Sequence, residues 1–244
     1  GRPARRADLC SDFGIFASVA GGIGLALGHT MNITEKKLAA VEISEIPTSD
    51  TPDTEKLLLA RLESSTTTDD YFRWMLFVVG FYRGINNIEA AARLLEDFIK
   101  VSQDVEQSAH CYLALGQIAT DEQRHDAALD YFTAALARGP KKRKVLYVLH
   151  NNIGFCLNSV GRFSEGEKHC REAIAIDWTR ASGYRNLGLS LNGQKNFIGA
   201  AWALAEAVKA DEPDNRARVL LEKLLALHPV LGVQCPWVMN VLNS

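Results

Sequence analysis

The sequence predicts an all-α protein built as a solenoid of antiparallel helix hairpins. Its 244 residues are 47% hydrophobic and 23% charged, and long stretches rich in Ala, Leu, Glu, Lys and Arg favour helices. Glycines recur inside helical patterns, with Gly154 and Gly188 separated by 34 residues. Small residues recur at a constant distance after these glycines. A fixed period of this length is typical of repeat proteins, in which each unit stacks on its neighbours.

Three copies of the repeat are visible when Gly116, Gly154 and Gly188 are superimposed. Each copy reads as a helix, a tight turn and a second helix. The equivalent positions are Leu115, Ile153 and Leu187; Tyr112, His150 and Tyr184; Ala119, Leu157 and Leu191; Ala128, Gly166 and Ala200; Phe132, Cys170 and Leu204; and Ala135, Ala173 and Ala207. Glycine in a helix interior costs about 1 kcal/mol relative to alanine. We therefore expect the paired helices to approach each other so closely at these glycines that a side chain would separate them.

The order aromatic–x–x–Leu–Gly–x–x–apolar, followed by Ala, Phe, Ala and Pro, resembles the tetratricopeptide repeat family over residues 109–213. The resemblance implies a right-handed solenoid that acts through protein–protein contacts. The middle copy departs from the family pattern at His150, Gly166, Cys170 and Trp178. The first spacing is 38 residues, and we expect the surplus, KKRK at 141–144, to be a solvated insertion that lengthens the first helix of the middle hairpin.

Sequence patterns around the repeats predict further helices. Two short amphipathic helices are expected at 34–46 and 53–65, with Thr34 and Asp53 as N-caps. A degenerate hairpin follows, with Met75, Val78, Tyr82, Ala91, Leu95 and Phe98 in repeat-equivalent places and Val79 in place of the glycine, so it should pack more openly. A capping helix begins near Asp214. The expected organisation is an apolar segment at 1–30, two short helices at 31–68, a degenerate hairpin at 69–105, three repeats at 106–213, and the capping helix with an apolar tail at 214–244.

Two segments leave alternatives open. The apolar stretch 13–28 is compatible with a short membrane span, a secretory leader, a segment buried on the solenoid, or a leading sequence before a start at Met31. We expect a cytoplasmic protein, with membrane association or export through residues 1–28 as the alternative. Its glycines do not form a dinucleotide-binding loop, because helices follow them instead of alternating strands. The tail 230–244 either folds back on the array, occupies the protein's own groove, or docks elsewhere.

No arrangement of residues predicts catalysis. The chain lacks an acyl-transfer serine motif, a phosphate-binding Gly-Lys-Ser/Thr loop and HExxH. We therefore expect no enzyme activity, no cofactor and no metal site. The formal net charge of −2 argues against a nucleic-acid partner. The five cysteines, which contain no CxxC pair, are expected to be free thiols in a reducing compartment: Cys10, Cys111, Cys156, Cys170 and Cys235.

The resemblance implies a groove lined by the first helix of each hairpin, and we expect it to bind an extended segment of another protein. Amides that recur at the 34-residue period, Asn152 with Asn186 and Asn158 with Asn192, would form two rows that donate to and accept from a peptide backbone. Arg185 would bind a carboxylate. The candidate peptide-binding residues are Asn151, Asn152, Phe155, Asn158, Arg185, Asn186, Asn192, Gln117 and His110.

One subtype of the family is disfavoured by the residues present. A clamp for a chaperone's C-terminal carboxylate needs basic residues in this groove, and Leu113, Ser182 and Asn186 stand where lysine, lysine and arginine are wanted. The sequence therefore predicts a non-enzymatic adaptor for other proteins. The alternative is a structural or assembly subunit of a larger complex that uses residues 1–65 and the apolar tail as permanent contacts. In this alternative, residues 13–28 could also contact a membrane. The oligomeric state stays open.

Overall fold

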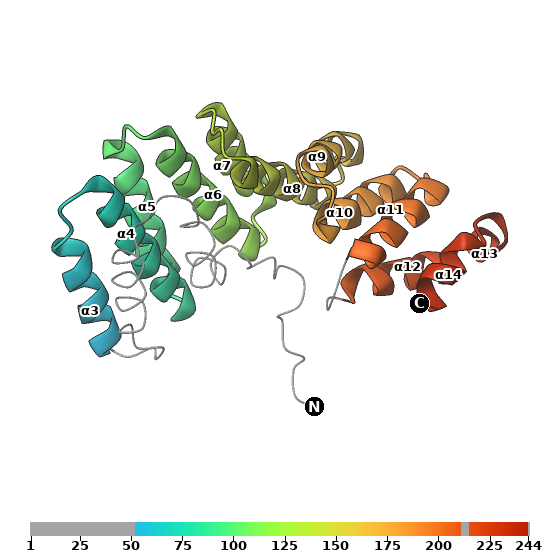
Figure 1. The fold of residues 1–244 in the computed structure, drawn as a ribbon, viewed down its shortest axis with the longest axis horizontal. Helices are drawn as coiled ribbons and strands as arrows, with labels where there is room; N and C mark the ends of the chain where they lie inside the picture. The colour runs from blue at the N-terminus through green and yellow to red at the C-terminus, as the bar shows by residue number, and fades with distance from the viewer. Residues whose placement is uncertain (1–51, 211–214, 244) are drawn as a thin grey trace, which may run out of the picture. The chain divides into compact units, whose positions relative to one another are not determined.

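The computed structural model describes residues 52–210 and 215–243, which form twelve helices and no strand (Figure 1). The predicted all-α class is confirmed. The chain divides into two compact units, residues 1–100 and 101–244. The expected helix at 34–46, the apolar stretch 13–28, Cys10 and the N-cap Asp214 lie outside the described residues.

The first unit contains α3 (Pro52–Glu63), α4 (Thr68–Gly84) and α5 (Ile88–Val101). The helix expected at 53–65 is α3, and it packs against α4. Tyr82 on α4 donates a hydrogen bond to Glu55 on α3 across 3.0 Å. The hydroxyl of Thr67 caps α4 by accepting from the Asp70 N–H at 3.1 Å. These contacts fix α3 along one side of the degenerate hairpin.

The hairpin of α4 and α5 is held together by large side chains. Val79 is fully buried, and the ring of Phe98 contacts the rings of Phe72 and Tyr71 at centroid distances of 5.3 and 6.0 Å. Few Cα atoms of the two helices approach within 8 Å of each other, in contrast to the hairpins of the second unit. The hairpin therefore packs more openly, as the substitution of Val79 for glycine predicts.

The second unit begins with three consecutive hairpins: α6 (Val105–Asp121) with α7 (His125–Ala137), α8 (Arg143–Ser159) with α9 (Phe163–Ile176), and α10 (Ala181–Gly193) with α11 (Phe197–Ala210). Helices α6, α8 and α10 also lie next to one another, since α8 contacts both of the others. The unit is thus a solenoid in which the first helices of the hairpins form one layer and the second helices the other.

The turn inside every hairpin uses the same backbone geometry. Seven residues after the superimposed glycine stands a residue in the left-handed region: Gln123 at φ 61°, Gly161 at φ 81° and Lys195 at φ 62°. The first unit repeats this feature, because Asn86, seven residues after Val79, has φ 61°. Left-handed geometry is uncommon outside glycine and asparagine. Its recurrence shows that the degenerate hairpin is built on the same turn as the others.

The predicted close approach at the glycines is confirmed. A Cβ atom added to Gly154 would stand 2.6 Å from the Cys170 sulfur, and one added to Gly188 would stand 2.6 Å from Cγ of Leu204. At Gly116 the added atom would overlap the ring of Phe132. In each hairpin the obstructing residue lies sixteen positions after the glycine. Glycine at these positions therefore lowers the helix propensity but allows the two helices to pack closely.

The KKRK insertion spans the start of α8, with only Arg143 and Lys144 inside the helix. Lys141 and Lys142 precede the helix, and their backbone N–H groups donate to the Glu106 carboxylate at 2.6 and 3.2 Å. Helices α6 and α8 both have 17 residues and α10 has 13, so the insertion does not make α8 longer than the first helix of the preceding hairpin. The expected lengthening is therefore not observed, and α10 is the short member of the series.

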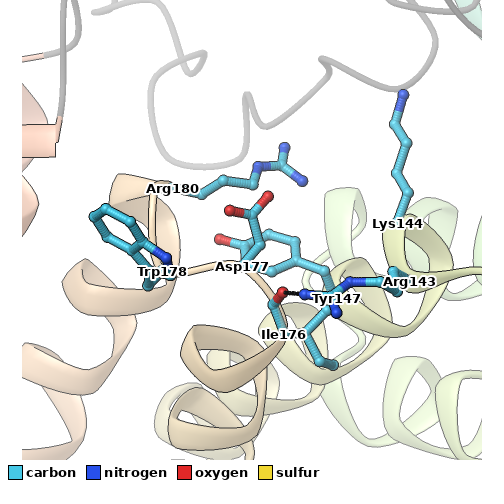
Figure 2. Close-up of a pocket in the computed structure, with 7 residues that line it drawn as sticks. All are labelled: Arg143, Lys144, Tyr147, Ile176, Asp177, Trp178 and Arg180. Carbon is cyan, nitrogen blue, oxygen red and sulfur yellow. Dashed lines mark hydrogen bonds between the residues drawn. The ribbon is translucent and has the colours of Figure 1, made fainter.

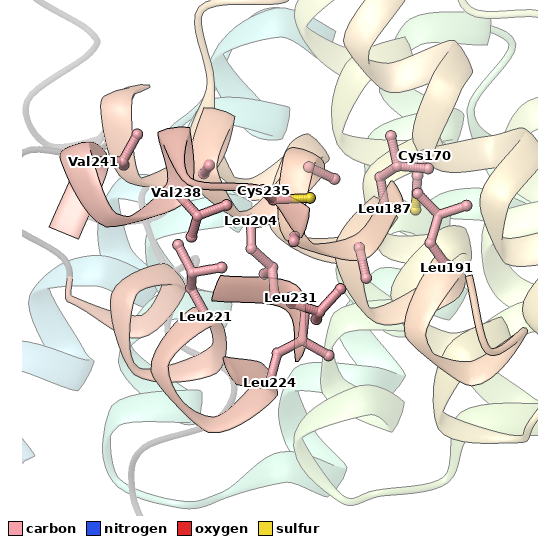
Figure 3. Packing of buried hydrophobic residues seen from close by; sticks show 14 residues of the cluster. Cys170, Leu187, Leu191, Leu204, Leu221, Leu224, Leu231, Cys235, Val238 and Val241 are labelled. Carbon is pink, nitrogen blue, oxygen red and sulfur yellow. The ribbon is translucent and has the colours of Figure 1, made fainter. Parts of the chain in front are cut away.

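The C-terminal helices α12 (Arg216–Leu227), α13 (Val230–Gln234) and α14 (Trp237–Asn243) follow the last hairpin and pack against α11. Leu231, Cys235, Val238 and Val241 join one buried cluster with Leu204 of α11 (Figure 3). The Arg218 guanidinium donates to the Leu242 carbonyl at 2.6 Å and fixes the tail to α12. The tail thus folds back on the array. Within the described ranges, no helix combines the length and apolarity needed to cross a membrane.

Candidate peptide-binding surface

The first helices α8 and α10 are joined by a chain of amide hydrogen bonds. The Asn186 Nδ2 donates to the backbone oxygen and to Oδ1 of Asn151, at 3.3 and 3.0 Å. The Asn158 Nδ2 donates to the Asn186 backbone oxygen at 2.9 Å, and the Ser190 hydroxyl donates to Oδ1 of Asn158 at 2.7 Å. The recurring amides therefore hold two neighbouring repeats in register.

This network corrects the expectation for Asn151 and Asn186. Both side chains are buried, with 4% and 3% of their surface exposed, so neither faces a ligand. Their hydrogen-bonding groups are used between the helices, where an unpaired amide would cost about 1–3 kcal/mol. The predicted row of Asn152 with Asn186 is not formed on the surface, because only Asn152 of this pair is partly exposed.

Five predicted residues of α8 and α10 are at least partly exposed. Asn152, Phe155, Asn158 and Arg185 are half-buried, and Asn192 is exposed, but the Asn158 amide is already bonded to α10. Asn152 accepts a hydrogen bond from Asn151 across 3.4 Å, which orients its amide. The ring of Phe155 meets His125 edge-on, at a centroid distance of 5.8 Å. This set offers an amide, an aromatic ring and a guanidinium on two helices that the buried network fixes together.

The candidates on α6, Gln117 and His110, are half-buried. The Nδ1 of His110 lies 3.1 Å from the Glu106 carbonyl, and burial holds the pKa of this imidazole below its ordinary value. A carboxylate clamp needs lysine at the positions of Leu113 and Ser182. Both residues are buried, with 2% and 7% of their surface exposed. The structure supplies no cation at these places.

A pocket of about 450 Å³ lies at the end of α8 where the turn between α9 and α10 meets it (Figure 2). The Arg143 guanidinium donates to the Ile176 carbonyl at the end of α9. The Arg180 guanidinium lies 4.3 Å from the centre of the Tyr147 ring. The lining residues are Arg143, Lys144, Tyr147, Ile176, Asp177, Trp178 and Arg180.

Tyr147 forms the buried wall of the pocket. Its side chain is 2% exposed, and its oxygen lies 2.7 Å from the Ser182 hydroxyl and accepts from the Gly183 N–H at 3.1 Å. These bonds satisfy groups in the first turn of α10, which has no side-chain N-cap of its own. Sequence reasoning missed this pocket. The signal was present, because KKRK and Trp178 are both departures from the repeat pattern and both lie just before a first helix.

A pair of histidines links α8 to α9. The Nδ1 atoms of His150 and His169 are 3.1 Å apart, so one imidazole donates and the other accepts. Burial lowers the pKa of both side chains, and the neighbouring imidazole lowers that of His169 further. Among the described residues, no group of three or more His, Cys, Asp and Glu side chains is placed to hold a metal ion.

The described cysteines Cys111, Cys156, Cys170 and Cys235 are buried free thiols. Desolvation raises the pKa of Cys111 and that of Cys170 to about 12. A thiol with such a pKa stays protonated near neutral pH and is a poor nucleophile. The thiols therefore act as small core side chains in this structure.

Comparison with known proteins supports the fold. A MamA chain from Desulfovibrio magneticus RS-1, residue 41 to the end, is 17% identical and superimposes with a TM-score of 0.54, covering 70% of this chain and 94% of that one. BtubC from P. vanneervenii is 13% identical with a TM-score of 0.63, covering 77% of this chain and 89% of BtubC. No family model matches the sequence.

A relative by sequence is the Hsp70-Hsp90 organising protein of Plasmodium falciparum. It is 29% identical over 105 residues, which cover 42% of this chain and 39% of the relative. The same-named protein of isolate 3D7 matches over 17% of its length. The chain thus spans well under half of these relatives. Together with the helix order and the glycine contacts, the findings define a helical-repeat protein. Its three glycine-containing hairpins have the tetratricopeptide repeat fold.

Proposed function

We propose that this protein is a non-enzymatic adaptor that binds an extended segment of another protein on the surface formed by α8 and α10. We name this surface, defined by Asn152, Phe155, Arg185 and Asn192, the amide–aromatic surface. The carrying observation is the buried network of Asn151 and Asn186, which fixes the two helices before any partner binds. A preorganised surface loses less conformational entropy on binding than a flexible one.

The chemistry of the amide–aromatic surface suits a peptide backbone. The Asn152 and Asn192 side chains can donate and accept, as a peptide group does. Phe155 supplies an apolar contact, and Arg185 supplies a guanidinium suited to a carboxylate. The name of the Plasmodium relative describes a protein that organises two others, and we propose a comparable bridging role here. The missing cations at Leu113 and Ser182 favour a segment other than a chaperone's C-terminal carboxylate.

The adaptor proposal is tested by selecting peptides from a display library on the full chain and measuring their affinity for variants. Phe155→Ala, Arg185→Glu and Asn152→Asp should each weaken the selected peptides by about tenfold, because contacts at the centre of an interface carry most of its energy. Glu172→Lys and Asn240→Asp, at exposed positions on α9 and α14, are the controls and should leave affinity unchanged. Unchanged affinity in all three surface variants, with the fold intact, would refute the proposal.

A second candidate function, a subunit of a larger assembly, is favoured by exposed apolar side chains on the C-terminal helices. Leu227, Val230 and Val233 are 75%, 62% and 84% exposed, and Met239 is 44% exposed. Apolar side chains left exposed to this degree are common at protein interfaces. Light scattering after size-exclusion chromatography should show self-association that Val233→Glu removes. A monomer at all concentrations would argue against contacts between copies of this chain at these residues.

A further inference from the structure

We propose that the pocket between α8 and the α9–α10 turn binds an acidic, apolar-bearing segment of the adaptor's protein partner. We call this pocket the rim pocket. Its lining residues are Arg143, Lys144, Tyr147, Ile176, Asp177, Trp178 and Arg180. The inference deepens the proposed adaptor function, on which it rests, by naming the charge of the partner segment. It depends on two departures from the repeat pattern, KKRK and Trp178, which the fold brings to one place although 34 residues separate Lys144 from Trp178.

The charge of the rim pocket is positive. Among the described residues that line it, Arg143, Lys144 and Arg180 contribute three cations and Asp177 contributes one carboxylate. That carboxylate already accepts from the backbone N–H and the hydroxyl of Thr179, at 3.2 and 2.7 Å. A ligand that enters the pocket therefore meets an excess of positive charge, and a ligand rich in Asp and Glu is complementary to it.

Two of the cations are held in defined positions. Arg143 is anchored by its bond to the Ile176 carbonyl, at the negative end of the α9 dipole. Arg180 is held on the face of Tyr147, which is itself fixed by Ser182 and Gly183. Guanidinium groups in fixed positions bind carboxylates with less entropy loss than freely rotating side chains. The rim pocket is thus more than a chance gathering of surface charge.

The indole of Trp178 adds an apolar contact. It is 71% exposed at the mouth of the pocket, although tryptophan is a costly residue to leave in water. The family pattern has proline at this place, so the fold of the repeat does not require an indole here. Tryptophan is enriched among residues that dominate binding energy. An aliphatic or aromatic side chain between acidic residues of the partner would cover it.

A nucleic acid is a poorer match to the same groups. Binding to nucleic acid draws its affinity from many phosphate contacts along a basic surface. This chain has a net charge of −2, and three cationic side chains line the rim pocket within the described part of the chain. An acidic peptide needs only a few carboxylates at one place. We therefore assign the site to a protein segment and make nucleic acid an outcome of the test.

The probe is a fluorescently labelled peptide, acetylated and amidated, of sequence Gly-Glu-Asp-Phe-Glu-Glu-Asp-Gly, titrated with the full chain by anisotropy. Trp178→Ala should weaken binding about tenfold, and Lys144→Gln with Arg180→Gln at least as much. Added salt should weaken binding to the wild type more than to the double variant. A peptide with Gln and Asn in place of Glu and Asp is the charge control and should bind poorly.

The matched control protein carries Lys168→Gln and Lys223→Gln, which remove two exposed cations of α9 and α12 outside the rim pocket. It should bind the acidic peptide as the wild type does. Trp178→Ala keeps the test valid if the Arg180 variant misfolds, because the indole is mostly exposed. Equal weakening by the control pair, or no binding at millimolar peptide, would overturn the inference. Tighter binding of an oligothymidylate that the same variants abolish would reassign the site to nucleic acid.

The two proposals fail in different ways. If library-selected peptides lose affinity with Phe155→Ala but not with Trp178→Ala, and the acidic probe does not bind, the adaptor function stands and the rim pocket has no part in it. If no selected peptide responds to the amide–aromatic variants, the adaptor proposal fails at that surface, whatever the acidic probe shows.

Discussion

The hairpin of α4 and α5 and the hairpin of α10 and α11 share a turn but not a packing mode. Both place a residue in the left-handed region at the same repeat position, Asn86 in one and Lys195 in the other. Seven residues earlier, the first has a buried Val79 and the second has Gly188, pressed against Leu204. The turn alone therefore sets the direction of the chain, and the residue at the contact sets how closely the helices approach.

The largest expected effect comes from filling the contact of the close hairpin. Gly188→Leu should destabilise the second unit by about 3 kcal/mol, because Leu204 stands where the new side chain must go and overpacking a dense core forces backbone shifts. Urea unfolding followed by far-UV circular dichroism measures the change.

The control for this substitution is Gly80→Leu on α4. A Cβ added at Gly80 meets no atom within 4 Å, so leucine should be accommodated and helix propensity should improve. Equal destabilisation by the two leucines would show that close approach at Gly188 is not what distinguishes the two hairpins.

The next effect comes from the amide network, which has no counterpart among the described contacts of α4 and α5. Asn186→Ala should cost about 2 kcal/mol, because it leaves the buried Oδ1 of Asn151 without its donor. Asn192→Ala, on the exposed face of α10, should be close to neutral. Thermal unfolding of the two variants tests this, and similar melting temperatures would contradict a structural role for Asn186.

The smallest expected effect is a pH dependence of stability that differs between the two regions. Burial lowers the pKa of His110, His125, His150 and His169, so these side chains stay neutral in the folded chain at a pH where the unfolded chain takes up protons. The free energy of unfolding should therefore fall as the pH drops below about 6.5, the pKa of an unperturbed histidine.

Within the described part of the chain, the acid effect should be confined to the second unit, because residues 52–100 contain no histidine. Hydrogen exchange read by mass spectrometry should show faster exchange in α8 and α9 at pH 5.5 than at pH 7.5, after correction for intrinsic rates, and no such change in α4. His150→Gln should reduce the difference. A uniform response of both units would contradict the assignment to these imidazoles.

The fold was predictable because the same pattern of contact residues recurs in every copy of the repeat. The period located Gly116, Gly154 and Gly188, and the residue sixteen positions later was Phe132, Cys170 or Leu204. Binary patterning then separated buried from exposed faces. The open packing of the degenerate hairpin followed from one substitution, Val79 for glycine.

The site was predictable only in part, because equivalent positions of two repeats can have side chains with different hydrogen-bond partners. Asn186 and Asn152 occupy the same place in consecutive copies, yet Asn186 is bonded inside the network and Asn152 is partly exposed. The difference arises from Asn151 in the preceding repeat, whose amide captures Asn186. Arg143 and Arg180 were missed because their meeting depends on the geometry of a turn that sequence spacing does not give.

The contact between Gly154 and Cys170 makes the second hairpin a reporter of its own opening. The sulfur occupies the space that any side chain at Gly154 would need, and the thiol is fully buried. The Ser190 hydroxyl of α10 also lies 3.8 Å from this sulfur, so an alkylating reagent or an oxidant can reach it only after α9 has separated from α8 or from α10. The rate at which Cys170 is modified therefore measures how often α9 separates from its neighbouring helices.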